Sequence, residues 1–309
     1  MSAGASGPQF GERAEYGPDD ICFLHPDRPT FTLCQRCGRS ICPECQHYSP
    51  VGVLCTECLR HSQPSALTRT GRSTRVAARR ATDAATPIVT YSLMALCVLV
   101  FGAQLLAANV GDDEVTRALW YAPLYSLPQL FEPWRMLTAM FTHSTSFLLH
   151  ILFNMFALWV FGRNLELIVG RVTFLVLYLF SGIGGSLAVM MWVYADLDTL
   201  QVATVGASGA IFGLFAATLV AVKAANVNVT SLAVLIGINF AIGFLPGAAI
   251  SWQSHLGGMI VGAATMGILL VTRGPRRRRA RVTALSALGV VLVALTGLYF
   301  VLPPIIVPW

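Results

Sequence analysis

Apolar residues dominate the chain after residue 86, where they form seven blocks separated by short polar joints. An α-helix needs about 20 mostly apolar residues to cross the hydrocarbon core of a bilayer, and most blocks reach or approach that length. The fourth block is short and rich in Gly and Ala, but the joints on both sides support it. We therefore predict seven transmembrane helices, at about residues 87–109, 146–165, 171–195, 207–223, 228–245, 250–272 and 283–303.

Residues 1–86 differ in character, because they hold seven of the eight cysteines and no apolar run long enough to span a bilayer. We predict a disordered N-terminus at 1–20, a small cysteine-rich domain at 21–61 and a basic, flexible linker at 62–86. Residues 87–309 form the membrane domain. The predicted fold class is an all-α polytopic membrane protein with a small N-terminal domain.

Composition supports this division. The chain is 55% hydrophobic and only 12% charged, whereas average globular chains carry about 25% charged residues, which argues against a soluble enzyme. The formal net charge is +6, but most basic residues flank apolar blocks, which indicates the edge of a membrane rather than a nucleic-acid surface. The lipid bilayer is an expected partner, and nucleic acid is not.

Basic residues also predict the orientation of the chain. They gather in every second joint, while the other joints hold only Arg117 and Arg135. Because basic joints usually face the cytoplasm, we predict a multi-pass plasma-membrane protein with a cytoplasmic N-terminus and an extracytoplasmic C-terminus. The basic joints carry Arg69, Arg72, Arg75, Arg79 and Arg80, then Arg163 and Arg171, then Lys223, and finally Arg273, Arg276, Arg277, Arg278, Arg279 and Arg281.

Four polar side chains lie near the outer ends of three predicted helices. His150 and Asn154 are one turn apart on the second helix and therefore share a face. Ser208 opens the fourth helix, and His255 lies in the first two turns of the sixth. Polar groups are costly in hydrocarbon unless they find partners or water, so we expect these side chains to face one another.

A serine beside a histidine is a nucleophile with its general base. A carboxylate would complete a triad, but Glu166, which alone among the acids touches a span, lies roughly 18 Å of helix beyond Asn154. The sequence therefore predicts a Ser208–His255 dyad. His150, Asn154 and the backbone N–H of Ser208 are the expected hydrogen-bond donors to a developing oxyanion.

Small residues surround this set. Ser208 lies within Gly206-Ala207-Ser208-Gly209, and Gly258 and Gly262 form a small-xxx-small pair after His255. Such pairs let two helix backbones come close, which a serine and a histidine on different helices require. Taken singly, each of these features more often marks helix packing than a site.

Taken together, the motifs resemble those of the rhomboid family of intramembrane serine proteases. The resemblance covers about residues 87–303, and the motifs follow the family's order and spacing. It rests on Gly206-Ala207-Ser208-Gly209, His255-Leu256-Gly257-Gly258, His150-xxx-Asn154, Trp134-Arg135, Gly162-xxx-Glu166 and Gly258-xxx-Gly262.

The resemblance implies a six-helix rhomboid core followed by a seventh helix as an extension. Ser208 would be the nucleophile and His255 the general base, without a catalytic cofactor. His150 and Asn154 would help to form the oxyanion hole. Phe212 stands where the family often has a Tyr that stacks on the catalytic His.

Ser254 replaces the Ala that commonly precedes the catalytic His in the family. The implied substrates are transmembrane segments of single-span or polytopic membrane proteins, which must unwind locally before attack. Residues 110–146 are long for a connection, which predicts a partly embedded structure that controls access. Trp134 would anchor it at the interface, although aromatic residues are common there in any case.

The cysteine-rich domain offers eight metal ligands in four pairs, enough for two structural zinc sites. Disulfides are rare in the cytoplasm, where we expect this domain to lie. The sequence does not fix which pairs share a metal; we expect the first pair to join the third, which resembles cross-braced B-box or RING-like zinc fingers. The pairs are Cys22-xx-His25, Cys34-xx-Cys37, Cys42-xx-Cys45 and Cys55-xx-Cys58.

Such a small domain would depend on its metal to fold. It would either dock a cytoplasmic protein partner or serve only as a soluble fold. Three alternatives to a protease stay open for the whole chain: an inactive relative that binds transmembrane segments, a transporter or channel, and a membrane-tethered zinc adaptor. The first would not need both Ser208 and His255, and the second would need ionisable groups leading to the inner face.

Overall fold

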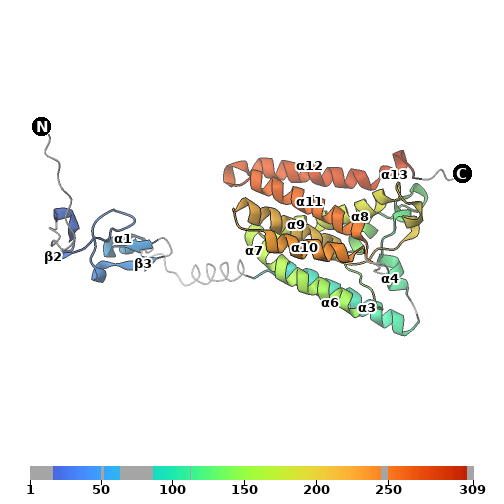
Figure 1. The fold of residues 1–309 in the computed structure, drawn as a ribbon, viewed down its shortest axis with the longest axis horizontal. Coiled ribbons are helices and arrows are strands. Elements are labelled where there is room, and N and C mark those ends of the chain that lie inside the picture. Colours follow the sequence, from blue (N-terminus) through green and yellow to red (C-terminus); the bar gives the residue numbers. More distant parts are fainter. Residues whose placement is uncertain (1–16, 50–51, 63–85, 112, 245–249, 305–309) are drawn as a thin grey trace, which may run out of the picture. The chain divides into compact units, whose positions relative to one another are not determined.

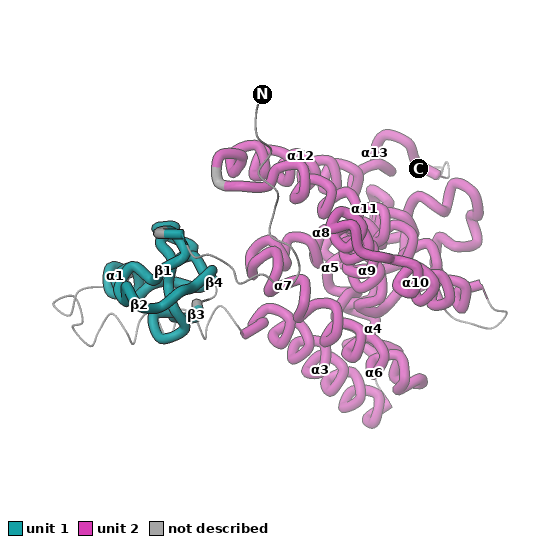
Figure 2. Tube along the Cα trace, turned by 60° about the vertical axis from the view of Figure 1, so that its left-hand side comes forward, with its two compact units in different colours: residues 1–81 teal, residues 82–309 magenta. Residues whose placement is uncertain are grey.

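The computed structural model describes residues 17–49, 52–62, 86–111, 113–244 and 250–304. The chain divides into two compact units, Met1–Ala81 and Thr82–Trp309 (Figure 1, Figure 2). Most of the predicted N-terminal tail and of the predicted linker lies outside the described residues, and so do five basic residues of the linker, Arg69, Arg72, Arg75, Arg79 and Arg80.

The first unit is built from two small hairpins and a helix. Its buried apolar residues are six cysteines together with Ile41 and Leu54. A core this small supplies little hydrophobic stabilisation. The elements are β1 (Ile21–Cys22) paired antiparallel with β2 (His25–Pro29), β3 (His47–Ser49) paired antiparallel with β4 (Gly52–Leu54), and α1 (Thr56–Ser62).

The second unit is a bundle of apolar helices (Figure 1). Five helical stretches are long and apolar enough to cross a membrane, and two apolar helices, α9 and α10, are shorter. The helices are α3 (Ile88–Asn109), α6 (Leu148–Ala157) continued through a π-helical turn (Leu158–Gly162) into α7 (Arg163–Val169), α8 (Arg171–Trp192), α9 (Ser208–Ala224), α10 (Thr230–Ile242), α11 (Trp252–Val271), α12 (Arg278–Thr296) and α13 (Leu298–Val301).

These helices fall on the seven predicted apolar blocks, which confirms the predicted fold class of a mostly helical membrane unit beside a small cysteine-rich one. The seventh begins earlier than expected, at Arg278 instead of residue 283. Arg and Ala are strong helix formers, so the basic run before the apolar block continues the helix into the polar region instead of ending it.

Three helices, α8, α9 and α11, pack with their backbones in contact. A Cβ atom on Gly258 of α11 would overlap the carbonyl oxygen of Gly209 on α9, and one on Gly262 would overlap that of Gly213. Gly257 lies against the backbone of α8 in the same way. The predicted small-residue pair therefore does bring two helices together, and close van der Waals packing between them follows.

Two helices of the bundle are too short to cross a bilayer of ordinary thickness. α9 has 17 residues, about 26 Å at 1.5 Å per residue, whereas the hydrocarbon core measures about 30 Å. Its first residue, Ser208, therefore lies below the membrane surface when the other end of α9 reaches the opposite surface. α10 has 13 residues, and Ile236 is its one buried side chain.

The connection between α3 and α6 is folded and partly buried within the protein. Tyr121, Leu127 and Met136 are all buried in the hydrophobic cluster that it shares with α8 and α12. The connection contains α4 (Glu114–Leu119), 3-10 helices at Pro123–Ser126 and Pro128–Leu130, and α5 (Arg135–Thr138).

Arg135 holds this connection together from inside. Its guanidinium is mostly buried, forms an ion pair with Glu132 and donates hydrogen bonds to the backbone carbonyls of Arg117 and Trp120. The guanidinium carbon lies 4.0 Å from the centre of the Tyr125 ring. A planar group with five donors suits this role, because it can bond to several carbonyls at once.

Backbone hydrogen bonds also pin the connection to the segment before α9. Tyr121 and Thr204 exchange N–H···O bonds of 3.2 and 2.7 Å, and the N–H of Gly206 donates to the carbonyl of Ala139 at 2.9 Å. The residues that precede Ser208 are thus attached to the α3–α6 connection. In a low-dielectric medium these paired backbone groups are costly to separate.

Glu166, the acid that lies too far away for a triad, caps the first turn of α3. Its carboxylate accepts the backbone N–H groups of Val89 and Thr90, at 2.9 and 2.7 Å, and the hydroxyl of Thr90 at 2.7 Å. The free N–H groups of a helix start, and its dipole, favour a carboxylate there.

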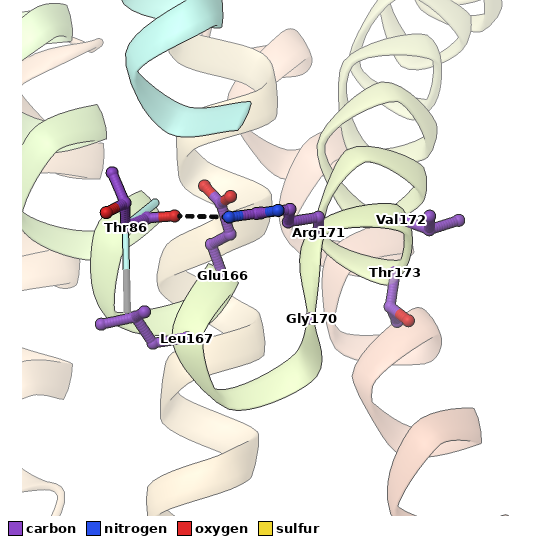
Figure 3. A pocket seen from close by; sticks show the side chains of 7 residues that line it. All are labelled: Thr86, Glu166, Leu167, Gly170, Arg171, Val172 and Thr173. Carbon is purple, nitrogen blue, oxygen red and sulfur yellow. Dashed lines mark hydrogen bonds between the residues drawn. The ribbon is translucent and has the colours of Figure 1, made fainter. Parts of the chain in front are cut away.

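A pocket of about 480 Å³ opens beside this cap (Figure 3). The guanidinium of Arg171 crosses it to donate to the carbonyl of Thr86 at 3.4 Å. The pocket lies at the end of the bundle opposite Ser208, since it is lined by the last turn of α7 and the first turn of α8. Its lining residues are Thr86, Glu166, Leu167, Gly170, Arg171, Val172 and Thr173.

The seventh helix, α12 followed by the short α13, packs on α8 and α11. Two hydrogen bonds hold it at the C-terminal end of α8. The buried hydroxyl of Tyr299 in α13 donates to the carbonyl of Met190, and that of Tyr194 donates to the carbonyl of Leu302. Phe300 meets Phe131 of the α3–α6 connection edge to face, with ring centres 4.9 Å apart.

Replacing Gly258 by Ala tests the backbone contact between α9 and α11. The added methyl group would overlap a carbonyl oxygen that cannot rotate away, so we expect a loss of about 1–3 kcal/mol of stability, typical of an overpacked core. Thermal unfolding of the purified protein in detergent measures it. Gly267→Ala is the matched control on the same helix, because nothing lies within 4 Å of its Cβ position; an equal loss there would contradict the interpretation.

Candidate functional site

Ser208 is the first residue of α9 and follows a turn that requires glycine. Gly206 has φ +117°, a conformation that L side chains rarely adopt. A Cβ atom there would also lie 2.7 Å from Nε2 of His150 and 3.8 Å from Oγ of Ser208. The imidazole of His150 and the hydroxyl of Ser208 therefore border the same small space beside Gly206.

His255 approaches this space from α11. Its ring is buried and stacks on the ring of Phe212, with centres 3.9 Å apart and planes at 13°. Phe212 lies one turn after Ser208 on α9, so the histidine is held against the turn of α9 that begins with the serine. The predicted stacking of Phe212 on His255 is thus present in the structure.

Asn154 lies one turn after His150 and forms a hydrogen bond within its own helix. Its side chain is buried one turn after His150, and its Nδ2 donates to the backbone carbonyl of His150 at 2.7 Å. One N–H of the amide is therefore used within α6. The role of Asn154 as an oxyanion donor stays a prediction, and it would depend on the second N–H or on a different rotamer.

The start of α9 adds backbone donors. Ile211 donates its N–H to the carbonyl of Ala207, so the N–H groups of Ser208, Gly209 and Ala210 precede the first intrahelical bond of the helix. These groups and the positive end of the helix dipole point towards the segment that contains Gly206. An anion that forms at this place meets a favourable potential.

The sequence pattern did not single out two further buried polar residues on the side of His150. His143 is buried, and its ring centre lies 5.2 Å from that of His150. Gln104, on α3, is buried and hydrogen-bonds to the backbone of His143. A polar residue inside an apolar block was the signal that could have identified Gln104, since such residues are rare and usually functional in membranes.

The hydroxyl of Ser208 and the imidazole of His150 thus lie beside Gly206, at a helix start that can stabilise an anion, and the imidazole of His255 lies against the first turns of the same helix. This arrangement suits attack by the hydroxyl on a carbonyl group, with a histidine as base. Residues 130–272 match the family model described as the Rhomboid domain. The chain carries a rhomboid domain. This domain includes Ser208, His255, His150 and Asn154.

The chain is similar to proteins named as rhomboids. It is 34% identical to rhomboid protease GluP of Bacillus subtilis over 69% of this chain and 40% of that protein. It is 28% identical to rhomboid protease AarA of Providencia stuartii, over 64% of this chain and 79% of that protein. It is 34% identical to RHOMBOID-like protein 6, mitochondrial, of Arabidopsis thaliana, over 45% of each. The chain thus spans less than half the length of GluP and of the plant protein.

The cysteine-rich unit forms two clusters of possible metal ligands, each made of two of the predicted pairs. In both clusters all ligand atoms lie within 4.8 Å of one another. The first pair joins the third and the second joins the fourth, which is the alternating arrangement expected above. One cluster is Cys22, His25, Cys42 and Cys45, and the other is Cys34, Cys37, Cys55 and Cys58.

The spacing of these ligand atoms fits a tetrahedral ion. Nδ1 of His25 lies 3.4 Å from the sulfurs of Cys42 and Cys45, and Cys37 and Cys55 have sulfurs 3.9 Å apart. A tetrahedral zinc site with ordinary bond lengths has ligand edges of roughly 3.5–3.8 Å. The distance of 3.9 Å also excludes a disulfide between Cys37 and Cys55.

Electrostatics inside each cluster favour a cation. Burial, followed by the neighbouring sulfurs of Cys42 and Cys22, raises the pKa of Cys45. Burial and the sulfur of Cys55 raise the pKa of Cys58 in the same way. The three thiols of the first cluster and the four of the second cannot all lose their protons side by side unless a positive ion sits between them, so each ligand set fits a metal.

Metal analysis of the purified full chain tests both clusters. We expect about two zinc ions per chain, and about one in Cys22→Ser, because a three-ligand structural site binds far more weakly. Cys97→Ser is the control, since Cys97 is a buried residue of α3 in the other unit. A wild-type content of one ion or none, or an unchanged content in Cys22→Ser, would refute the two-site assignment.

Proposed function

We propose that the rhomboid domain is an intramembrane serine endopeptidase that cleaves transmembrane segments of other membrane proteins. The nucleophile is Ser208 and the general base is His255. The observation that carries the proposal is the stacking of His255 on Phe212, in the turn that begins with Ser208.

The reaction follows from these positions. His255 takes the hydroxyl proton of Ser208 as Oγ attacks the scissile carbonyl carbon, and the carbonyl oxygen becomes an oxyanion. Nε2–H of His150 and the first N–H groups of α9 stabilise that charge. The C–N bond then breaks, and His255 passes the proton to the leaving nitrogen. Water, activated by the same imidazole, hydrolyses the remaining ester.

Stacking takes the place of a carboxylate in holding the base. Nδ1 of His255 is buried and has no hydrogen-bond partner among the described residues. In a triad that nitrogen would donate to an acid, which would fix the ring. Here the ring of Phe212 fixes the plane of the imidazole, so a dyad is sufficient for orientation.

The substrate reaches Ser208 most easily on the side of α10. This helix is short and buries only Ile236, and Leu232 and Phe240 pack against the core beside it. Phe240 meets Phe212 with ring centres 6.3 Å apart, and Phe244 stacks on Trp252 at 5.2 Å. Few contacts have to separate there for a transmembrane segment to pass from the bilayer to the site.

The names of the relatives support this function. GluP and AarA are called rhomboid proteases, and both align with a large part of this chain. Ser208 and His255 are present within the matched domain, which favours an active protease over an inactive binder of transmembrane segments.

Zinc is the metal we propose for both clusters of the cysteine-rich unit. Ligand sets of Cys₃His and Cys₄ type, with every ligand supplied by the protein, are typical of structural zinc. The sites have no position left for a substrate, so the unit acts through its surface, as a docking module for a cytoplasmic protein.

For orientation, we propose a cytoplasmic N-terminus and a plasma-membrane location. The described basic residues Arg163, Arg171, Lys223 and Arg273 lie at the ends of helices opposite the Ser208 end. The basic run at the start of α12 lies at the same level. By the positive-inside rule this end faces the cytoplasm, and Ser208 then lies near the outer surface.

A cleavage assay in liposomes with a single-span test protein tests the proposal. We expect the wild type to cut the substrate within or near its transmembrane segment. Ser208→Ala and His255→Ala should each lower kcat by more than about 10³-fold, because the nucleophile and its base act as one unit.

Two controls match these variants. Ser286→Ala changes an exposed serine of α12, and His61→Ala an exposed histidine of α1, and both should keep wild-type rates. Unaltered thermal unfolding of the site variants shows that they are folded. Cleavage that persists in Ser208→Ala would refute the assignment, and binding of the test protein without any cleavage by the wild type would favour the inactive binder.

A further inference from the structure

Gln104 is a buried amide in the middle of an apolar helix, and the proposed mechanism does not use it. Its Oε1 accepts the backbone N–H of His143 at 3.0 Å, and its Nε2 donates to the backbone carbonyl of the same residue at 3.0 Å. The amide therefore pairs with both backbone groups of one residue, as a neighbouring strand would. Because an N–H can only donate and a carbonyl can only accept, these partners also fix which end of the amide is oxygen.

Ser144, which follows His143, forms a hydrogen bond with His150. The backbone N–H of Ser144 donates to Nδ1 of His150 at 3.3 Å. A ring nitrogen that accepts a hydrogen bond carries no proton, so a neutral His150 has its proton on Nε2. Nε2 is the atom that faces Gly206 and borders the same space as the hydroxyl of Ser208.

The tautomer decides whether His150 can assist the reaction. With the proton on Nε2, the imidazole donates to an oxyanion beside Ser208. With the proton on Nδ1, it would present a lone pair to that oxygen and repel it. The direction of a single backbone N–H, that of Ser144, therefore selects the useful state of the ring.

Among the described residues, the side chain of Gln104 supplies the side-chain hydrogen bonds to the backbone of His143. The ring of His143 is buried, and neither of its nitrogens has a hydrogen-bond partner among the described residues. The ring meets His150 edge to face, which does not fix the direction of the following peptide. The clamp by Gln104 is therefore what orients the peptide that carries the N–H of Ser144.

We propose that Gln104 is a positioning residue for the proteolytic reaction. It holds the backbone at 143–144 so that Ser144 keeps His150 in the Nε2–H tautomer, ready to donate to the oxyanion. This inference rests on the proposed protease function for the role of the oxyanion, but the tautomer itself can be measured without any cleavage.

The kinetic test uses Gln104→Met, which keeps the length of the side chain and removes its hydrogen bonds. We expect kcat to fall by about tenfold or more, since one oxyanion donor is lost, with KM within about twofold of wild type because substrate binding is untouched. Should this variant not fold, Gln104→Asn, one methylene too short for the clamp, takes its place with the same expectation.

A matched control separates the clamp from general packing. Nε2 of Gln104 also donates to Oγ1 of Thr116 at 3.0 Å, and Thr116→Val removes that bond alone. We expect Thr116→Val to keep kcat near the wild-type value. Equal loss in both variants, or a rise in KM with unchanged kcat in Gln104→Met, would show that Gln104 serves only to hold α3 in place.

The spectroscopic test reads the tautomer directly. Nitrogen-15 NMR of the histidine-labelled full chain in liposomes should show His150 protonated at Nε2 and bare at Nδ1, with the signal assigned by its loss in His150→Gln. In the Gln104 variant we expect a mixture of tautomers. A wild type protonated at Nδ1, or a variant with an unchanged spectrum, overturns the inference. If the wild type cleaves nothing, the proposed function fails, yet this spectrum still decides the role of Gln104.

Discussion

The site depends on the close approach of α9 and α11. Gly209 faces Gly258, and Gly213 faces Gly262, with the backbone of one helix against that of the other. Lipid offers no hydrophobic force to press helices together, so contact of this kind must come from shape. Ser208 lies one residue before the first glycine contact and His255 three residues before it, which sets both at nearly the same depth. A larger side chain at either glycine of α11 would move Ser208 and His255 apart without changing either residue.

Polar groups inside the bundle obey a second constraint, because bilayer hydrocarbon leaves no water to satisfy them. Glu166 caps α3, Arg135 gathers the carbonyls of the α3–α6 connection, and Gln104 pairs with one peptide. Each of these side chains joins segments that are far apart in the sequence. They therefore hold these segments rigidly together. Backbone hydrogen bonds attach the segment before Ser208 to the α3–α6 connection, which Arg135 holds.

Much of this architecture could be predicted from the sequence. Hydropathy located all seven apolar helices, and polar residues at equal depth pointed to Ser208, His255 and His150. The ligand pairs of the cysteine-rich unit were evident from their spacing, because that spacing is local. Contacts across the fold were not evident from the sequence: the bond between Ser144 and His150 does not follow from periodicity. Such bonds depend on the path of a loop, and a loop has no repeating pattern to reveal it.

The seventh helix covers α8 and α11, whereas the short helix α10 covers α9 through few contacts. Tyrosine hydroxyls fasten the seventh helix at the far end of α8. On the proposed function, a substrate segment in the bilayer would therefore reach the site from the α10 side. If the proposed function holds, a protein bound to the outer face of α12 would leave the route along α10 unobstructed, so an adaptor and a substrate could bind the same molecule at once.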